Sequence, residues 1–365
     1  MGLSIGIVGM PNVGKSTLFN AITNAGAEAQ NYPFCTIEPN SGIVPINDPR
    51  LFILGEMGQS KEVIPAVIEF TDIAGLVKGA SQGEGLGNKF LTHIREVSAI
   101  AHVVRCFDDD NITHVDGRID PASDIETINL ELILSDLDLA EKMHGTMHRK
   151  MRMVKDLETQ QRFALLERIK DALAENIPIR HLELTPEEYT MAINMNFLTI
   201  KKMIYVANVS EADVITGNHY TQQVAEIAKK DNDEFAVISA RIEEELSQFS
   251  KEEKKEFMAE AGIAEAGLDA ITRKCFSLLG LQTYLTTGEK ESRAWTIKRG
   301  DTAPKAAGVI HTDFERGFIR ANIVTYDDFI ANNGWKGAKE KGLLRQEGKD
   351  YVMQDGDIVE FLFNV

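Results

Sequence analysis

Residues 9–16 read Gly-Met-Pro-Asn-Val-Gly-Lys-Ser and match the pattern G-x-x-x-x-G-K-[ST] of phosphate-binding loops. The apolar run at 5–8 before this stretch predicts a buried strand, and the run at 17–22 after it predicts a helix. Glycines let a backbone curve around phosphate with its N–H groups pointing inward, and a helix N-terminus adds partial positive charge. The stretch therefore predicts a nucleoside triphosphate site on an α/β sheet.

Each side chain of the loop has an expected role. Lys15 reaches the β and γ phosphates, where its charge assists the reaction, and Ser16 offers a hydroxyl to Mg²⁺. The residues that we expect to contact the nucleotide here are Asn12, Val13, Gly14, Lys15, Ser16 and Thr17.

Two later segments complete the predicted Mg²⁺ site. Thr36 can add a ligand beside Ser16 and sense the γ-phosphate. Asp72 ends a predicted strand and begins a D-x-x-G sequence, in which the carboxylate holds Mg²⁺ and the Gly75 N–H bonds the γ-phosphate. The predicted metal ligands are therefore Ser16, Thr36 and Asp72, with Gly75 among the catalytic groups.

The residue after Gly75 is Leu76, where many switch GTPases have a glutamine that orients the attacking water. A leucine can neither donate nor accept a hydrogen bond, so another group must act. His114 is our candidate, because it follows the predicted strand at 101–107 on the nucleotide side of the sheet and imidazole can orient water. Asn12 is the rival, because it could help to hold a K⁺ ion beside the phosphates.

The sequence Asn208-Val209-Ser210-Glu211 stands where a guanine-reading N-K-x-D would be. Valine replaces the lysine that covers the ring, and Glu211 carries its carboxylate one methylene further out than aspartate would. Buried polar recognition is sensitive to such displacement, so we do not expect guanine specificity. Ser239 and Ala240 follow the next strand and are expected to meet the base through backbone N–H groups. The predicted base site is thus Asn208, Val209, Glu211, Ser239 and Ala240.

Composition places limits on partners. The chain has 365 residues and a net charge of −17, which argues against a whole-surface attraction to nucleic acid. The charge is uneven, because residues 281–365 carry 12 Lys and Arg against 13 Asp and Glu. Any contact with RNA is therefore expected to use this nearly neutral part. The three cysteines are dispersed, no apolar run is long enough for a membrane span, and the first strand leaves no room for a signal peptide. We expect a cytoplasmic protein without disulfides.

The changing pattern of apolar and polar residues along the chain predicts three domains. Apolar residues recur at helical spacing over 123–177 and predict an antiparallel helical hairpin, which a capping box at Ser123 and Glu126 would begin. A further helix is expected over 243–260. The strands that we predict are 3–8, 64–71, 100–107, 202–208, 235–238, 293–297, 318–324 and 358–363. The domains are a P-loop NTPase domain (1–122 and 201–280), a helical insertion (123–200) and a small α+β domain (281–365).

These features together resemble the YchF-type Obg-like ATPases, a family of translation-factor P-loop NTPases. The resemblance is carried by 9–17, 31–39, 72–81, 83–91, Asn208 with Glu211, 293–296 and 306–320, and extends over essentially the whole chain. It implies a G-domain that prefers ATP over GTP and hydrolyses it slowly, a C-terminal TGS domain of β-grasp fold, and association with ribosomes and stress regulation. We expect the hairpin and the TGS domain to contact the ribosome or its RNA.

Two other functions stay open at this point. One is a GTPase acting in translation despite the altered base sequence. The other is a ribosome-binding or RNA-binding adaptor whose nucleotide is structural and scarcely turned over. Leu76 favours the adaptor, whereas the intact set of Mg²⁺ ligands favours the ATPase.

Overall fold

The computed structural model describes residues 4–25, 40–73, 86–109, 118–151 and 156–364. Its packing defines two compact units. The second unit takes residues 43–68 together with 272–364, and the first takes the described residues within 1–27, 37–42 and 69–271. Residues 43–68, which the sequence analysis gave to the NTPase domain, therefore pack with the C-terminal segment. The division into three domains stays a prediction.

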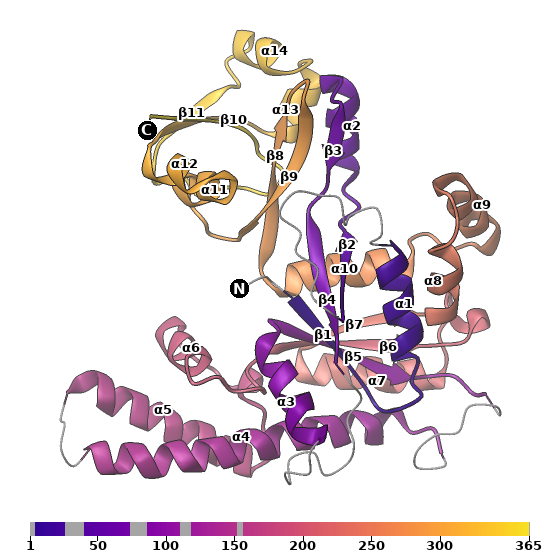
Figure 1. The fold of residues 1–365 in the computed structure, drawn as a ribbon, viewed down its shortest axis with the longest axis vertical. Coiled ribbons are helices and arrows are strands. Elements are labelled where there is room, and N and C mark those ends of the chain that lie inside the picture. The colour runs from indigo at the N-terminus through magenta and orange to yellow at the C-terminus, as the bar shows by residue number, and fades with distance from the viewer. Residues whose placement is uncertain (1–3, 26–39, 74–85, 110–117, 152–155, 365) are drawn as a thin grey trace. The chain divides into compact units, whose positions relative to one another are not determined.

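A six-stranded sheet with the order β2-β4-β1-β5-β6-β7 forms the centre of the first unit, apart from residues 43–45 and 67–68 of its strands, which the packing assigns to the second unit (Figure 1). Its strands are β1 (Ser4–Val8), β2 (Ser41–Pro45), β4 (Val67–Asp72), β5 (Ala99–Arg105), β6 (Lys202–Asn208) and β7 (Glu234–Ile238). The pairs β1–β4, β1–β5, β5–β6 and β6–β7 are parallel. The strand order reverses direction at β1, so the loop after β1 lies at a switch point of the sheet, where α/β proteins bind their ligands.

Helices connect these strands, as expected for parallel pairs. They are α1 (Lys15–Ala25), α3 (Leu86–Glu96), α4 (Pro121–Met151), α5 (Leu157–Ala174), α6 (Pro186–Ile193), α7 (His219–Asp231), α8 (Ala240–Leu246), α9 (Lys251–Ala261) and α10 (Gly267–Leu278), with 3₁₀ turns at Ile179–His181 and Glu211–Asp213. The C-terminal segment of the second unit begins within α10, at residue 272.

The long helices α4 and α5 run antiparallel and side by side, so the predicted hairpin is confirmed (Figure 1). Leu166, Ile169 and Leu173 of α5 are buried, and Leu139 and Met143 of α4 pack against the same cluster. The predicted capping box was wrong. Helix α4 already starts at Pro121, and the Ser123 N–H donates to Asp120 Oδ1 at 3.1 Å, because proline favours the first helical position and aspartate the position before it.

The single helix predicted over 243–260 is two helices, α8 and α9. Ser250 interrupts the run, because its hydroxyl accepts a hydrogen bond from the Glu253 N–H while the Glu253 side chain returns to the Ser250 N–H. This reciprocal cap starts a new helix at Lys251.

The second unit holds a mixed six-stranded sheet with the order β11-β10-β12-β8-β9-β3. The strands are β3 (Glu62–Ile64), β8 (Leu281–Thr287), β9 (Glu291–Lys298), β10 (Phe318–Val324), β11 (Arg345–Glu347) and β12 (Ile358–Phe363), and the helices are α2 (Pro49–Gly58), α11 (Ala303–Ile310), α12 (Thr312–Arg316), α13 (Tyr326–Ala331) and α14 (Trp335–Glu340). Strand β3 pairs parallel with β9, and Leu51 and Leu54 of α2 share a buried cluster with Leu285 and Ala294. The early segment is therefore part of this unit's core.

Candidate nucleotide site

The phosphate-binding loop has the predicted context, between the end of β1 at Val8 and the start of α1 at Lys15. A Cβ atom on Gly9 would lie 2.4 Å from the Val103 carbonyl oxygen of the neighbouring strand. Gly14 has φ +95°, and a Cβ there would lie 2.2 Å from Asn208 Nδ2. Both glycines are therefore required by close approach, and Gly14 also by its backbone conformation.

The Lys15 ammonium group lies folded back over the loop. Its Nζ donates hydrogen bonds to the carbonyl oxygens of Gly9 at 2.8 Å and Met10 at 2.7 Å. Burial lowers the pKa of Lys15 to about 8, and the nearby Asp72 carboxylate opposes the shift. A partly desolvated cation that donates to neutral carbonyls can transfer to phosphate oxygens, which offer full negative charge.

The side chains predicted to hold Mg²⁺ lie at neighbouring elements. Asp72 is the last residue of β4 and lies opposite Ile7 in the register with β1. Burial raises the pKa of the Asp72 carboxyl, and Lys15 counteracts this. Ser16 is exposed in the first turn of α1. Hydroxyl and carboxylate oxygens are the donors that Mg²⁺ prefers, so these two residues fit the ion.

Asn208 joins two loops of the site. Its Nδ2 donates to the Val13 carbonyl at 2.9 Å, and its Oδ1 accepts from the Ala240 N–H at 2.9 Å. The side chain is buried, so both hydrogen bonds form away from water. The sequence analysis predicted Asn208 as a base-site residue, and the structure adds that it fastens the phosphate loop to the loop after β7.

The other base-site candidates differ in exposure. Val209 is 3% exposed and belongs to the core, so its side chain offers no surface to a ring. Glu211 is exposed and pairs with Arg241, with its Oε1 3.1 Å from the arginine Nε. The Ser239 hydroxyl is buried and finds no hydrogen-bond partner among the described residues, which leaves it available to a ligand. Ala240 is buried and begins α8.

Four residues named from sequence, Thr36, Gly75, Leu76 and His114, lie outside the described residues. Asn12 and Thr17 lie within them: Asn12 has φ 62° in the loop, and Thr17 is half-buried on α1. The roles of all these residues stay predictions.

Sequence reasoning missed Arg105, the last residue of β5. The side chain is 1% exposed. Its guanidinium donates to the carbonyls of Phe107 at 3.1 Å and Asp109 at 3.3 Å, and therefore fixes the backbone after β5 as far as Asp109. One signal in the sequence was available, an arginine at the end of an otherwise apolar strand. A charged residue is buried only when it is hydrogen-bonded, so this position indicated a structural role.

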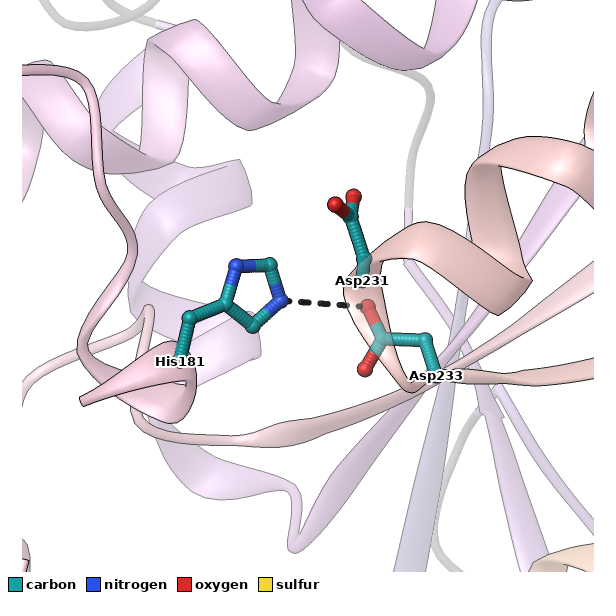
Figure 2. Close-up of side chains that lie close together, drawn as sticks. All are labelled: His181, Asp231 and Asp233. Atoms are coloured by element: carbon teal, nitrogen blue, oxygen red, sulfur yellow. Dashed lines mark ion pairs between the residues drawn. The ribbon is translucent and has the colours of Figure 1, made fainter. Parts of the chain in front are cut away.

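Figure 2 shows a second group of ionisable side chains, His181, Asp231 and Asp233, whose nearest nitrogen and oxygen atoms lie within 4.8 Å of one another. These are metal-ligating residue types. However, Asp233 Oδ2 is also 3.1 Å from Arg180 Nε and 3.7 Å from His181 Nε2. A guanidinium at this distance already neutralises the carboxylate, so we interpret the group as an ion-pair cluster at the base of the hairpin.

This combination of a phosphate loop after the first strand, a carboxylate at the end of β4 and an asparagine bridge from β6 defines a P-loop nucleotide hydrolase of the GTPase fold. A family model described as "50S ribosome-binding GTPase" matches residues 4–135. A second model, YchF-GTPase_C, described as a protein of unknown function (DUF933), matches residues 281–364.

Full-length relatives identify the family. The chain is 54% identical to the ribosome-binding ATPase YchF of Bacillus subtilis and 53% identical to that of Escherichia coli O157:H7, with 100% of each chain covered. The solved structure of the Schizosaccharomyces pombe YchF GTPase superposes with a TM-score of 0.90 at 38% identity, covering 99% of this chain and 98% of that one. The chain belongs to the YchF family. The predicted family, fold class and nucleotide hydrolase class are therefore confirmed. None of the helices in the described ranges is long and apolar enough to span a membrane.

Proposed function

We propose that this chain binds Mg²⁺–ATP in preference to GTP, hydrolyses it, and uses the nucleotide state to control its association with ribosomes in the cytoplasm. The bacterial relatives are named ribosome-binding ATPases. P-loop proteins adopt different conformations with nucleoside triphosphate and with diphosphate bound. A partner that binds one of these conformations more tightly is bound or released when the nucleotide is hydrolysed.

The proposed preference for ATP over GTP rests on the residues at the predicted base site, Val209 and Glu211. In N-K-x-D, the lysine stem covers the guanine and the aspartate accepts its two donors. Here Val209 is buried, and the Glu211 carboxylate is engaged by Arg241. Val209 therefore cannot cover a guanine ring and Glu211 has a competing partner, whereas the Ser239 hydroxyl, which has no hydrogen-bond partner among the described residues, and backbone groups can meet an adenine.

Calorimetric titration of ATP and GTP under identical Mg²⁺ conditions tests the preference. We expect ATP to bind at least as tightly as GTP. If GTP bound tenfold more tightly than ATP, a difference of about 1.4 kcal/mol, the proposed preference for ATP would be rejected. The GTPase alternative has support of its own, because the Schizosaccharomyces pombe relative is described as a GTPase.

The remaining alternative is an adaptor that keeps its nucleotide. Single-turnover hydrolysis, measured with and without ribosomes, separates it from the enzyme. Co-sedimentation with ribosomes in the presence of ATP, of ADP and of no nucleotide then tests the switch. Equal binding in all three conditions would contradict a nucleotide-dependent association.

The family generally uses Mg²⁺. Ser16 and Asp72 would hold this ion, together with Thr36, and the ion would neutralise charge on the β and γ phosphates. Lys15 would leave the carbonyls of Gly9 and Met10 to bind the phosphates, while Gly75 would donate its N–H to the γ-phosphate. The backbone of Val13 and Gly14 would complete the cradle.

For the attacking water we propose His114, with a K⁺ ion at Asn12 as the rival. Replacing His114 with alanine should lower kcat with little change in ATP affinity, because the imidazole would act only in the transition state. An unchanged kcat would remove His114 from the mechanism. Turnover that requires K⁺ rather than Na⁺ would then favour Asn12.

A further inference from the structure

The base loop is the segment at the end of β6, residues 208–213, which contains the predicted base-site residues. Its start continues the pattern of the sheet. The Cys106 N–H donates to the Asn208 carbonyl at 2.8 Å, and the Val209 N–H donates to the Ile238 carbonyl at 2.8 Å. The segments after β5 and β7 therefore hold the start of the base loop from both sides, whereas side chains hold its end.

The Asp213 carboxylate closes the base loop. Its Oδ2 accepts from the Ser210 hydroxyl at 2.9 Å and from the Asn218 side-chain amide at 3.0 Å. The same amide nitrogen of Asn218 donates to the Cys106 carbonyl at 2.8 Å. Together with the hydrogen bond from Cys106 to Asn208, these contacts form a closed chain of hydrogen bonds around the base loop.

Asn218 uses both the oxygen and the nitrogen of its side chain in this arrangement. The Oδ1 atom accepts from the N–H groups of Tyr220 at 3.0 Å and Thr221 at 3.1 Å, and so caps α7. The two hydrogens of Nδ2 go to Cys106 and Asp213. Turning the amide over would set its oxygen against a carbonyl and a carboxylate, so the partners fix its orientation.

Capping of α7 does not by itself account for an asparagine at position 218. A cap requires one acceptor, and serine or aspartate supplies it about as well as asparagine does. Asparagine adds two N–H donors, which aspartate lacks and which a single hydroxyl cannot replace. These donors bind the segment after β5 and the base loop, so Asn218 has a role at the nucleotide site in addition to its role at the helix end.

We propose that Asp213 and Asn218 are positioning residues for the base of the nucleotide, and that they thereby help to determine which base is accepted. The inference rests on the proposed function, which places the base at the base loop. Recognition by polar groups is sensitive to small displacements of those groups, so a loop held at both ends discriminates better than a loose one. The side chains of the pair donate to and accept from the base loop, α7 and the segment after β5, so the pair acts on the base through the base loop.

The test compares the affinity of the full-length protein for Mg²⁺–ATP with its affinity for Mg²⁺–tripolyphosphate, which has the phosphates without the base. Calorimetry measures both affinities, steady-state kinetics gives KM and kcat, and thermal melting checks folding. Asn218→Ser keeps an acceptor for the helix cap and removes both amide donors. Thr221→Val is the matched control, because it removes the hydroxyl that accepts from the Asn218 N–H at 2.9 Å in the same cap and leaves the amide contacts in place.

We expect Asn218→Ser to bind ATP about tenfold more weakly and to bind tripolyphosphate as the wild type does, because the lost hydrogen bonds hold the base side of the site. KM should rise with kcat unchanged, as expected for contacts made equally in the ground state and the transition state. Thr221→Val should lower the melting temperature and keep both affinities. Wild-type ATP affinity in Asn218→Ser would overturn the proposal. So would an equal loss of tripolyphosphate affinity, or the same loss of ATP affinity in Thr221→Val.

Reversing the pair gives a second test. Asn218→Asp keeps the cap acceptor but sets a carboxylate against that of Asp213, so it should bind ATP more weakly than Asn218→Ser. Adding Asp213→Asn restores a donor and an acceptor between the two positions, and the double variant should bind ATP more tightly than Asn218→Asp alone. Absence of this recovery would overturn the role of the pair. Tighter binding of GTP than ATP by the wild type would reject the proposed preference, while comparison of GTP with tripolyphosphate in the same variants would still test the positioning of the base.

Discussion

The side-chain amide of Asn208 lies 2.9 Å from the carbonyl oxygen of Val13, and this contact ties the loop after β6 to the phosphate loop. The same amide accepts from Ala240 at the start of α8. Base-side and phosphate-side loops are therefore joined through one buried residue. A conformational change in either loop has a direct mechanical route to the other.

Replacing Asn208 with alanine should weaken ATP binding about tenfold, because both loops lose their shared partner and two buried backbone groups lose a hydrogen bond. Asn208→Asp keeps an acceptor for Ala240 but has no donor for Val13, so it isolates the phosphate-loop contact. Calorimetry with ATP measures both variants. If Asn208→Asp bound ATP as tightly as the wild type, the Val13 contact would not matter for binding.

Lys15→Ala should abolish productive Mg²⁺–ATP binding and hydrolysis. The acceptors of the ammonium group in the described part of the chain are the neutral carbonyls of Gly9 and Met10, so a bound triphosphate would provide its strongest partner. Radiolabelled ATP turnover and filter binding measure the loss, and a melting curve without nucleotide checks that the variant is folded. Undiminished hydrolysis would place the chemistry elsewhere.

Arg180→Ala should destabilise the first unit by about 3 to 5 kcal/mol. The Arg180 and Asp233 side chains are 5% and 8% exposed, so removing the guanidinium leaves a buried carboxylate without its arginine, and with His181 3.7 Å away. Urea unfolding followed by circular dichroism measures the free energy. The double variant Arg180→Ala with Asp233→Ala should cost less than the sum of the two single changes, and strict additivity would show that the pair is not coupled.

His102 should make the protein sensitive to mild acid. The side chain is fully buried on β5, neither ring nitrogen has a hydrogen-bond partner among the described residues, and burial lowers its pKa to about 3, helped by Lys15 and Arg180. The unfolded chain takes up a proton near pH 6.5, whereas the folded chain does not. Stability attributable to this group is therefore lost as the pH falls from 6.5 toward 3, by about 2 kcal/mol at pH 5.

Comparison with His102→Leu isolates that contribution. Denaturation at pH 7 and pH 5 should show a smaller loss of stability for the leucine variant than for the wild type. The same loss in both proteins would mean that other groups cause the acid sensitivity.

The sequence predicted the parts of the fold whose signals are local. The phosphate loop, the strand before it and the hairpin all follow from short-range spacing, and β1, α1, α4 and α5 confirm them. The start of α4 and the break at Ser250 were misjudged, because competing capping residues lie within a few positions of each other.

Other features depend on contacts between residues far apart in the chain. The bridge from Asn208 to Val13 requires knowing which loops meet. The burial of Arg105 depends on carbonyl groups of its own loop, whose positions no periodicity reveals. Membership of α2 and β3 in the second unit arises from tertiary packing, which overrides the position of these elements in the sequence.

The packing of α2 and β3 with the C-terminal strands affects the chain during its synthesis. Synthesis proceeds from the N-terminus, so residues 43–68 leave the ribosome long before Leu281 begins the strands that cover them. Until then, Leu51 and Leu54 have no Leu285 or Ala294 against which to pack. A nascent chain of this protein therefore carries an uncovered apolar helix through most of its translation, and its second unit can close only when the last strands have been made.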